Sequence, residues 1–128
     1  MKNKPPKKFR LAAFNAVRDV GLSLPDMKLS TRYDGLPVLK VDGVFVAALA
    51  THASAEPGTL VVRMSTDERE WILADVPDVY YITDYYRKYP LVLVRLSKID
   101  RSALRDLLSV SRRIALTKTR RTRSSISI

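Results

Sequence analysis

The chain has 128 residues, of which 46% are hydrophobic and 28% charged, and it carries a formal net charge of +10. This composition is typical of a globular protein, and the length suits a single domain. The absence of cysteine excludes disulfides, thiolate metal sites and a cysteine nucleophile. The basic N-terminal segment is followed by an apolar stretch that Asn15, Arg18 and Asp19 interrupt, unlike a signal peptide. No run is long enough to span a bilayer, so we expect a cytoplasmic protein without a membrane partner.

The excess positive charge lies at the two ends of the sequence. Five of the 23 Lys and Arg residues fall within residues 2–10 and six within residues 112–123, and neither segment contains an acidic residue. The middle of the chain holds the remaining 12 basic and all 13 acidic residues, so it is nearly neutral. Basic ends suit a polyanion such as nucleic acid, whose binding weakens as salt rises. They are equally consistent with solvated extensions or with contact to an anionic membrane surface.

The first half of the chain predicts one helix followed by four strands. Residues 9–20 place apolar side chains at helical spacing, and Gly21 is the expected end of that helix. Two apolar runs then flank Asp42-Gly43, a dipeptide that tolerates the positive φ angles of a type I′ turn. This pattern predicts a β-hairpin, with further strands before it at 28–33 and after it at 60–64.

The second half predicts a helix, a hairpin and a last helix. The run Ser65-Thr66-Asp67-Glu68 fits a capping box at the start of a helix over 66–74. Residues 78–96 resemble two strands joined by an aromatic and basic turn, and Asp100 is placed to cap the final helix. The order α-β-β-β-β-α-β-β-α indicates an α+β domain, with an antiparallel sheet and helices packed on it.

We expect three parts along the chain. Residues 1–8 have too little apolar surface to order themselves and form a basic flexible arm. Residues 9–117 form the folded domain, and residues 118–128 form a basic C-terminal tail.

The turn between the last two predicted strands is rich in tyrosine and positive charge. An exposed tip of this composition can stack on bases and neutralise phosphates. Tyrosines in hairpins also pack across strands, so burial of these rings is the alternative. The candidate nucleic-acid-binding residues of the tip are Tyr85, Tyr86, Arg87, Lys88 and Tyr89.

A stripe of arginines follows one side of the last predicted helix and continues into the basic tail. With the tyrosine tip on the same side of the protein, helix and tail together could track a phosphate backbone. The alternative is a solvated helix face. The candidate residues of the stripe are Arg101, Arg105, Arg112, Arg113, Arg120 and Arg121.

Short motifs spread over residues 9–116 occur together in a combination that is typical of one protein family. They are Leu24-Pro25, Gly35-x-Pro37, the hairpin Lys40-Val41-x-Gly43-x-Phe45-x-Ala47, Asp67-Glu68-Arg69, Pro77-Asp78-Val79, and Tyr81-x-Thr83 followed by the most specific block, Tyr86 to Leu96. In these motifs the chain resembles the MmcQ/YjbR-like proteins. That resemblance implies an α+β fold with a double-wing motif and a role in DNA binding. The chain departs from the family's pattern at Tyr85, where relatives often have histidine, and at Leu91, where they often have an aromatic residue.

The sequence lacks the patterns of an enzyme. The single histidine, His52, has no partner at ligand spacing, and the chain contains no glycine-rich phosphate loop and no HExxH or EF-hand motif. We therefore expect no catalytic residue, no metal and no cofactor. The main hypothesis is a monomeric, non-enzymatic protein that binds nucleic acid, DNA more than RNA, with low sequence specificity. The alternative is a protein-interaction or chaperone-like module that binds a partner or small ligand on its sheet, with incidental basic tails.

Overall fold

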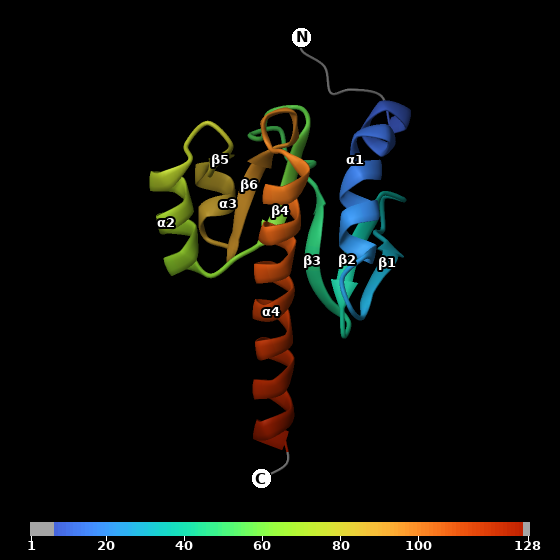
Figure 1. Cartoon of the computed structure of the whole chain (residues 1–128), viewed down its shortest axis with the longest axis vertical. Helices are drawn as coiled ribbons and strands as arrows, with labels where there is room; N and C mark the ends of the chain where they lie inside the picture. Colours follow the sequence, from blue (N-terminus) through green and yellow to red (C-terminus); the bar gives the residue numbers. More distant parts are fainter. Residues whose placement is uncertain (1–6, 127–128) are drawn as a thin grey trace.

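The protein folds as one antiparallel sheet with helices packed on it, which confirms the α+β prediction (Figure 1). The structure, a computed structural model, describes the backbone of residues 7–126 and the side chains of residues 14–118. In chain order its elements are α1 (Lys7–Leu22), β1 (Met27–Thr31), β2 (Pro37–Val41), β3 (Val44–Leu49), β4 (Thr59–Arg63), α2 (Thr66–Asp75), β5 (Tyr80–Tyr81), α3 (Asp84–Arg87), β6 (Leu91–Arg95), the 3-10 turn η1 (Leu96–Lys98) and α4 (Arg101–Ile126). The strands lie in the order β1-β2-β3-β4-β6-β5.

The β2–β3 hairpin turns as the Asp42-Gly43 dipeptide predicts. Asp42 has φ 54° and Gly43 has φ 76°, and the turn places Val41 opposite Val44. The pairing then shifts by one residue, because Lys40 lies opposite Phe45 whereas Leu39 lies opposite Ala47. The extra residue is a β-bulge, and it interrupts the alternation of side chains along β3.

The main core lies between one face of the sheet and helices α1, α2 and α4. Alternate residues of the central strands point into it, such as Leu60 and Val62 of β4, whose side chains are fully buried. Helix α4 contributes Leu104, Leu107 and Leu108 to this core. Figure 1 shows α1 and α4 crossing the same side of the sheet. We call this side of the protein the helix face.

The opposite side of the sheet, which we call the open face, has only a small second core. It consists of Val61, Tyr86 and Leu93, with half-buried residues such as Phe45 and Tyr81 packed around them. Val61 lies between Leu60 and Val62 in β4, so strand alternation alone places it on the other side. Short α3 and the 51–58 loop cover part of this face.

The helix ends agree with the predicted caps, with one exception. The Ser65 side chain accepts the Glu68 backbone N–H at 3.1 Å, and the Asp100 carboxylate accepts the Ala103 N–H at 2.8 Å. Gly21 does not end α1, contrary to the prediction, because the helix continues to Leu22. A Cβ at Gly21 would lie 2.5 Å from Leu39 Cδ1. The glycine is therefore explained by the close approach of α1 to β2.

The predicted turn inside residues 78–96 is wrong in detail. Strands β5 and β6 do pair antiparallel, with Tyr80 opposite Val94, but the connection between them contains the one-turn helix α3. The Thr83 carbonyl accepts the backbone N–H groups of both Tyr86 and Arg87, which closes that turn. The Tyr86 ring then packs on the sheet, so the connection folds back over the open face instead of projecting from it.

Helix α4 runs to Ile126, so the boundary expected between a folded domain and a tail at residue 118 lies within a helix. Residues 1–6 of the predicted N-terminal arm and residues 127–128 lie outside the described part of the chain.

Candidate nucleic-acid interface

Four aromatic rings gather on the open face, three from the segment around α3 and one from the 51–58 loop. The His52 and Tyr85 rings are stacked, with centroids 3.5 Å apart and an interplanar angle of 7°. Tyr86 meets the edge of both rings, and the Tyr89 ring centroid lies 6.2 Å from that of Tyr85. The Lys88 ammonium lies 5.5 Å from the Tyr85 centroid and 5.4 Å from the Tyr89 centroid, within cation–π range.

The three tyrosines of the predicted tip have two different roles. Tyr85 and Tyr89 are each 41% exposed, as a stacking surface requires, whereas Tyr86 is buried at 8%. The Tyr86 hydroxyl accepts the His52 backbone N–H at 3.2 Å, and burial raises the pKa of that hydroxyl. The prediction that Tyr86 contacts nucleic acid is therefore corrected, since this ring anchors α3 to the sheet and to the 51–58 loop.

A buried arginine, Arg69, holds the backbone at the start of β6, next to this cluster. Arg69 of α2 is only 4% exposed, and its Nη1 donates to the carbonyl oxygens of Tyr89 at 2.9 Å and Leu91 at 3.2 Å. Its Nε makes no hydrogen bond, although it lies 3.5 Å from the Glu70 carboxylate. Arg69 thus joins α2 to the start of β6 and sets the backbone path that presents Tyr89.

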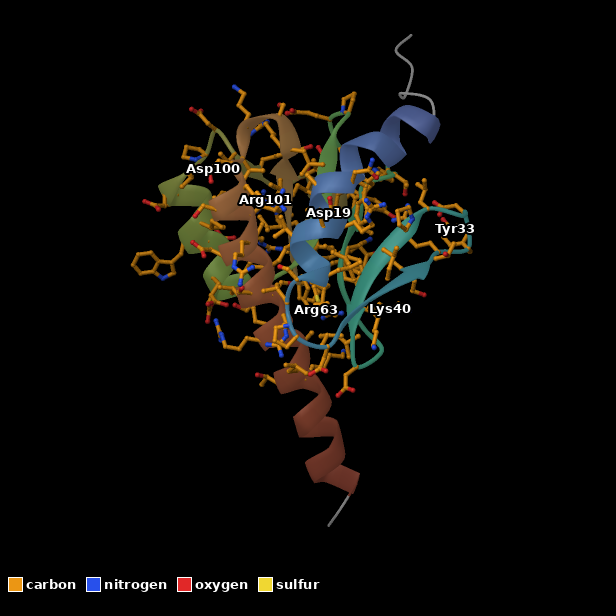
Figure 2. All side chains as sticks on the ribbon, turned by 45° about the vertical axis from the view of Figure 1, so that its right-hand side comes forward. Asp19, Tyr33, Lys40, Arg63, Asp100 and Arg101 are labelled. Atoms are coloured by element: carbon orange, nitrogen blue, oxygen red, sulfur yellow. The ribbon has the colours of Figure 1, made fainter. Side chains whose placement is uncertain are left out.

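Positive side chains form a row across the open face. Lys28 of β1 lies directly opposite Lys40 of β2, and Lys40 lies opposite Phe45 of β3. The Arg63 guanidinium of β4 lies 5.9 Å from the Phe45 centroid, its Nε donates to the Phe45 carbonyl at 2.6 Å, and burial lowers its pKa. Figure 2 shows Lys40 and Arg63 at the same end of the sheet, away from Arg101 at the start of α4.

This row of cations lacks acidic partners. Among the residues whose side chains are described, no carboxylate forms an ion pair with Lys28, Lys40, Arg63 or Lys88. Like charges directly opposite each other in a sheet, such as Lys28 and Lys40, are destabilising. An anion bound across this row would relieve that repulsion.

An open pocket of about 290 Å³ lies between Phe45 and the aromatic cluster. It is lined by Arg32, Phe45, Ala48, Leu49, Thr51, His52, Val61, Tyr85, Tyr86, Tyr89 and Leu91. Arg32 is held at its rim by two hydrogen bonds to the Asp34 carboxylate and one to the Leu49 carbonyl. The open face therefore combines exposed rings, unpaired cations and a concave surface.

The arginines of α4 lie on the other side of the sheet. Arg105 donates to the Ser23 hydroxyl at 3.0 Å, Arg112 to the Pro25 carbonyl at 2.7 Å, and Arg113 to the Glu68 carboxylate at 3.4 Å, while Arg101 is exposed. The structure therefore does not bring the predicted arginine stripe together with Tyr85, Arg87 and Lys88. The backbone of α4 includes Arg120 and Arg121, but their side chains lie outside the described part.

Several residues of the open face were missed by sequence reasoning. The sequence predicts His52 to be an isolated loop residue, because its contact with Tyr85 joins positions far apart in the chain. Lys28, Lys40 and Arg63 were not recognised as a group either. Strand alternation and the register of the Asp42-Gly43 hairpin do contain a signal for Lys40 and Phe45, which the turn places opposite each other.

An ion pair on the open face joins β6 to the 51–58 loop. Arg95 binds the Glu56 carboxylate through two hydrogen bonds of 3.0 and 2.9 Å, and its guanidinium lies 4.3 Å from the Tyr81 ring centroid. The hydrogen bond from Arg95 lowers the pKa of Glu56 below its ordinary value of 4.5. The pair connects the 51–58 loop to β6.

The Glu56 pair predicts a pH-dependent contribution to stability. A carboxylate whose pKa is depressed by folding stabilises the native state above its unfolded pKa and loses that contribution as pH falls through the folded pKa. Glu56→Gln should cost roughly 0.5 kcal/mol at neutral pH, as for other exposed pairs. The difference from the wild type should shrink below pH 4.5 in urea unfolding followed by circular dichroism. If the two proteins differed equally in stability at neutral pH and below pH 4.5, the Glu56 carboxylate would not be the source of this pH dependence.

The described residues contain neither a metal-ligand cluster nor a membrane-spanning helix. Within residues 14–118, no three His, Asp or Glu side chains are grouped so that they could hold a metal ion. In the described part of the chain, no helix is both long and apolar enough to cross a bilayer.

Sequence comparison finds relatives without a stated activity. A 63-residue stretch is 40% identical to an uncharacterised protein of Mycobacterium tuberculosis and to one of Mycobacterium bovis. The match covers 46% of the chain and 49% of each relative, so it spans about half the length of these curated proteins. No protein-family model matches the chain, and no solved structure matches it. Function must therefore be inferred from the site.

Proposed function

We propose that this protein is a non-enzymatic nucleic-acid-binding protein with low sequence specificity, DNA being preferred to RNA. The observation that carries the proposal is the row Lys28, Lys40 and Arg63, which has no acidic partner among residues 14–118 and continues towards Lys88 and the exposed rings of Tyr85 and Tyr89. Cations that follow a backbone and rings that accept bases are the two elements of sequence-tolerant binding. The net charge of +10 adds a long-range attraction to any polyanion.

The resemblance to the MmcQ/YjbR-like proteins supports the preference for DNA. Its most specific block, Tyr86 to Leu96, contains Lys88 and Tyr89 and follows Tyr85 directly. We place the binding surface on the open face, whereas the sequence had suggested a tip, a helix and a tail acting together. Binding there would be mainly electrostatic, because phosphate contacts position a protein on nucleic acid without reading its sequence.

Two triple variants with equal charge changes locate the interface. The first replaces Lys28, Lys40 and Lys88 by alanine on the open face, and the second replaces Arg101, Arg105 and Arg112 by alanine on the helix face. Each is titrated into labelled single-stranded and duplex DNA by fluorescence anisotropy, from about 50 to 200 mM salt. Losing three phosphate contacts should reduce the slope of log K against log salt by about 2 for single strands.

We expect that reduced slope, with an affinity loss of at least about tenfold at low salt, in the open-face variant alone. A larger loss in the helix-face variant would move the interface to α4 and contradict the proposal. Absence of binding by the wild type near physiological salt would reject nucleic acid as the ligand. Equal losses in both variants would show that net charge, and not the open face, governs binding.

The alternative of a module that binds a protein or small ligand on its sheet keeps one observation in its favour. Most residues that line the open-face pocket are apolar or aromatic, as is common in small-molecule sites. This alternative predicts that neither single-stranded nor duplex DNA binds near physiological salt, so the same titration series distinguishes it from the nucleic-acid proposal.

A further inference from the structure

The open-face pocket has small side chains at its base, which we call its floor, and aromatic side chains around it. Its floor is the cross-strand pair Ala48 and Val61, whose side chains are short and buried. Phe45 rises from the same strand as Ala48, and Tyr85 and Tyr89 approach from the α3 segment. A volume of about 290 Å³ is at the lower end of small-molecule sites, which suits one planar ring system better than a whole cofactor.

A polar donor is available beside this floor. The Ser54 backbone N–H donates to His52 Nδ1 at 3.0 Å, which makes that nitrogen an acceptor and Nε2 the donor of the ring. Among the described residues, no atom accepts a hydrogen bond from Nε2. The Arg32 guanidinium at the rim supplies a second group of donors, fixed by Asp34. Donors beside an apolar floor suit the edge of a heteroaromatic ring with acceptor atoms.

We infer that this pocket receives one unstacked nucleobase, so that the ligand on the open face is a single strand and not a duplex. The inference rests on the proposed function, since the row of cations would hold the phosphates of the neighbouring nucleotides. Bases within a duplex keep their faces stacked on each other and cannot lie against Tyr85 or Tyr89 without being flipped out. Single strands expose those faces, and every base has one, so sequence preference would be weak.

The experiment distinguishes binding of the bases from binding of the sugar-phosphate backbone. The full-length protein is titrated with an oligothymidylate of about 12 nucleotides and with an abasic deoxyribose-phosphate strand of the same length and charge. Duplex DNA and thymidine monophosphate are measured in parallel. Tyr85→Ala and Tyr89→Ala test the stacking surface, and Tyr33→Ala is the matched control. Tyr33 is 98% exposed in the β1–β2 turn, does not line the pocket, and lies at the outer edge of the sheet in Figure 2.

We expect the oligothymidylate to bind at least about fivefold more tightly than the abasic strand, which is the effect of one stacked base. Tyr85→Ala and Tyr89→Ala should each remove much of that ratio, because they should lower the affinity for the oligothymidylate more than the affinity for the abasic strand. Tyr33→Ala should change neither affinity. Thermal unfolding of each variant checks that the fold is retained.

Other outcomes overturn the inference in distinguishable ways. Equal affinity for the two strands would mean that the backbone alone is bound, which rejects the base pocket but keeps the proposed function. Binding of thymidine monophosphate as tight as that of the strand would make a free nucleotide the ligand. Tighter binding of duplex than of single strand would exclude an unstacked base. If no strand binds, the proposed function itself fails.

Discussion

Replacing Arg69 by alanine should lower the free energy of unfolding by about 2–4 kcal/mol. The substitution removes two hydrogen bonds, so the carbonyl oxygens of Tyr89 and Leu91 lose their donor. It also leaves a void, since the Arg69 side chain is almost completely buried between α2 and β6. Urea unfolding followed by circular dichroism measures the loss. Because Arg69 sets the backbone at Tyr89, the affinity for single-stranded DNA should fall as well.

Two control substitutions make the Arg69 result specific. Arg69→Lys keeps the charge, but its shorter side chain does not bring the ammonium to the position from which Arg69 Nη1 donates to both carbonyls, so it should lose roughly half as much stability. Arg87→Ala removes an exposed arginine nearby and should change stability by less than about 0.5 kcal/mol. If Arg69→Ala were as stable as Arg87→Ala, the bridge from α2 to β6 would not contribute to the fold.

Replacing Leu60 by alanine should lower the free energy of unfolding by about 2–5 kcal/mol. Leu60 lies in the central strand β4, has no exposed surface and packs in the core between the sheet and the helices. Its truncation removes buried apolar surface and leaves a cavity that strands on both sides prevent from collapsing. A loss of this size is a large fraction of the whole stability of a small domain.

Leu29→Ala is the matched control for Leu60→Ala. Leu29 has the same side chain and also lies in a strand, but β1 is an edge strand and the side chain is 45% exposed. Its truncation should cost less than about 1 kcal/mol. Both variants should keep the wild-type urea m-value, and equal losses would contradict the placement of the main core behind β4.

Local chemistry predicted most of the elements. The Asp42-Gly43 turn, the Ser65 N-cap and the Asp100 cap each act through hydrogen bonds or backbone angles within four residues, and all three are present. Gly21 is an example of a residue that local sequence rules do not explain. Its small size is explained by Leu39, eighteen positions further along the chain, and no local rule reveals that contact.

The candidate site was predicted only in part, for a similar reason. Composition singled out the segment from Tyr85 to Tyr89, and two of its rings are indeed exposed. The role of Tyr86 depends on its bond to His52, and the separation of α3 from α4 depends on which face of the sheet each helix covers. Tertiary packing determines both the role of Tyr86 and the separation of the two helices. Helix periodicity alone does not predict which face of a sheet a helix covers.

The bulge in β3 is a position where the length of this strand can change. Val46 and Ala47 are adjacent, yet both are fully buried in the main core, while Phe45 before them and Ala48 after them line the open-face pocket. Deleting Val46 or Ala47 would remove the bulge and restore strict alternation, with Phe45 and Ala48 still on the open face. Homologous chains should therefore tolerate the loss of one residue at this bulge, as well as the gain or loss of residues in the 51–58 loop.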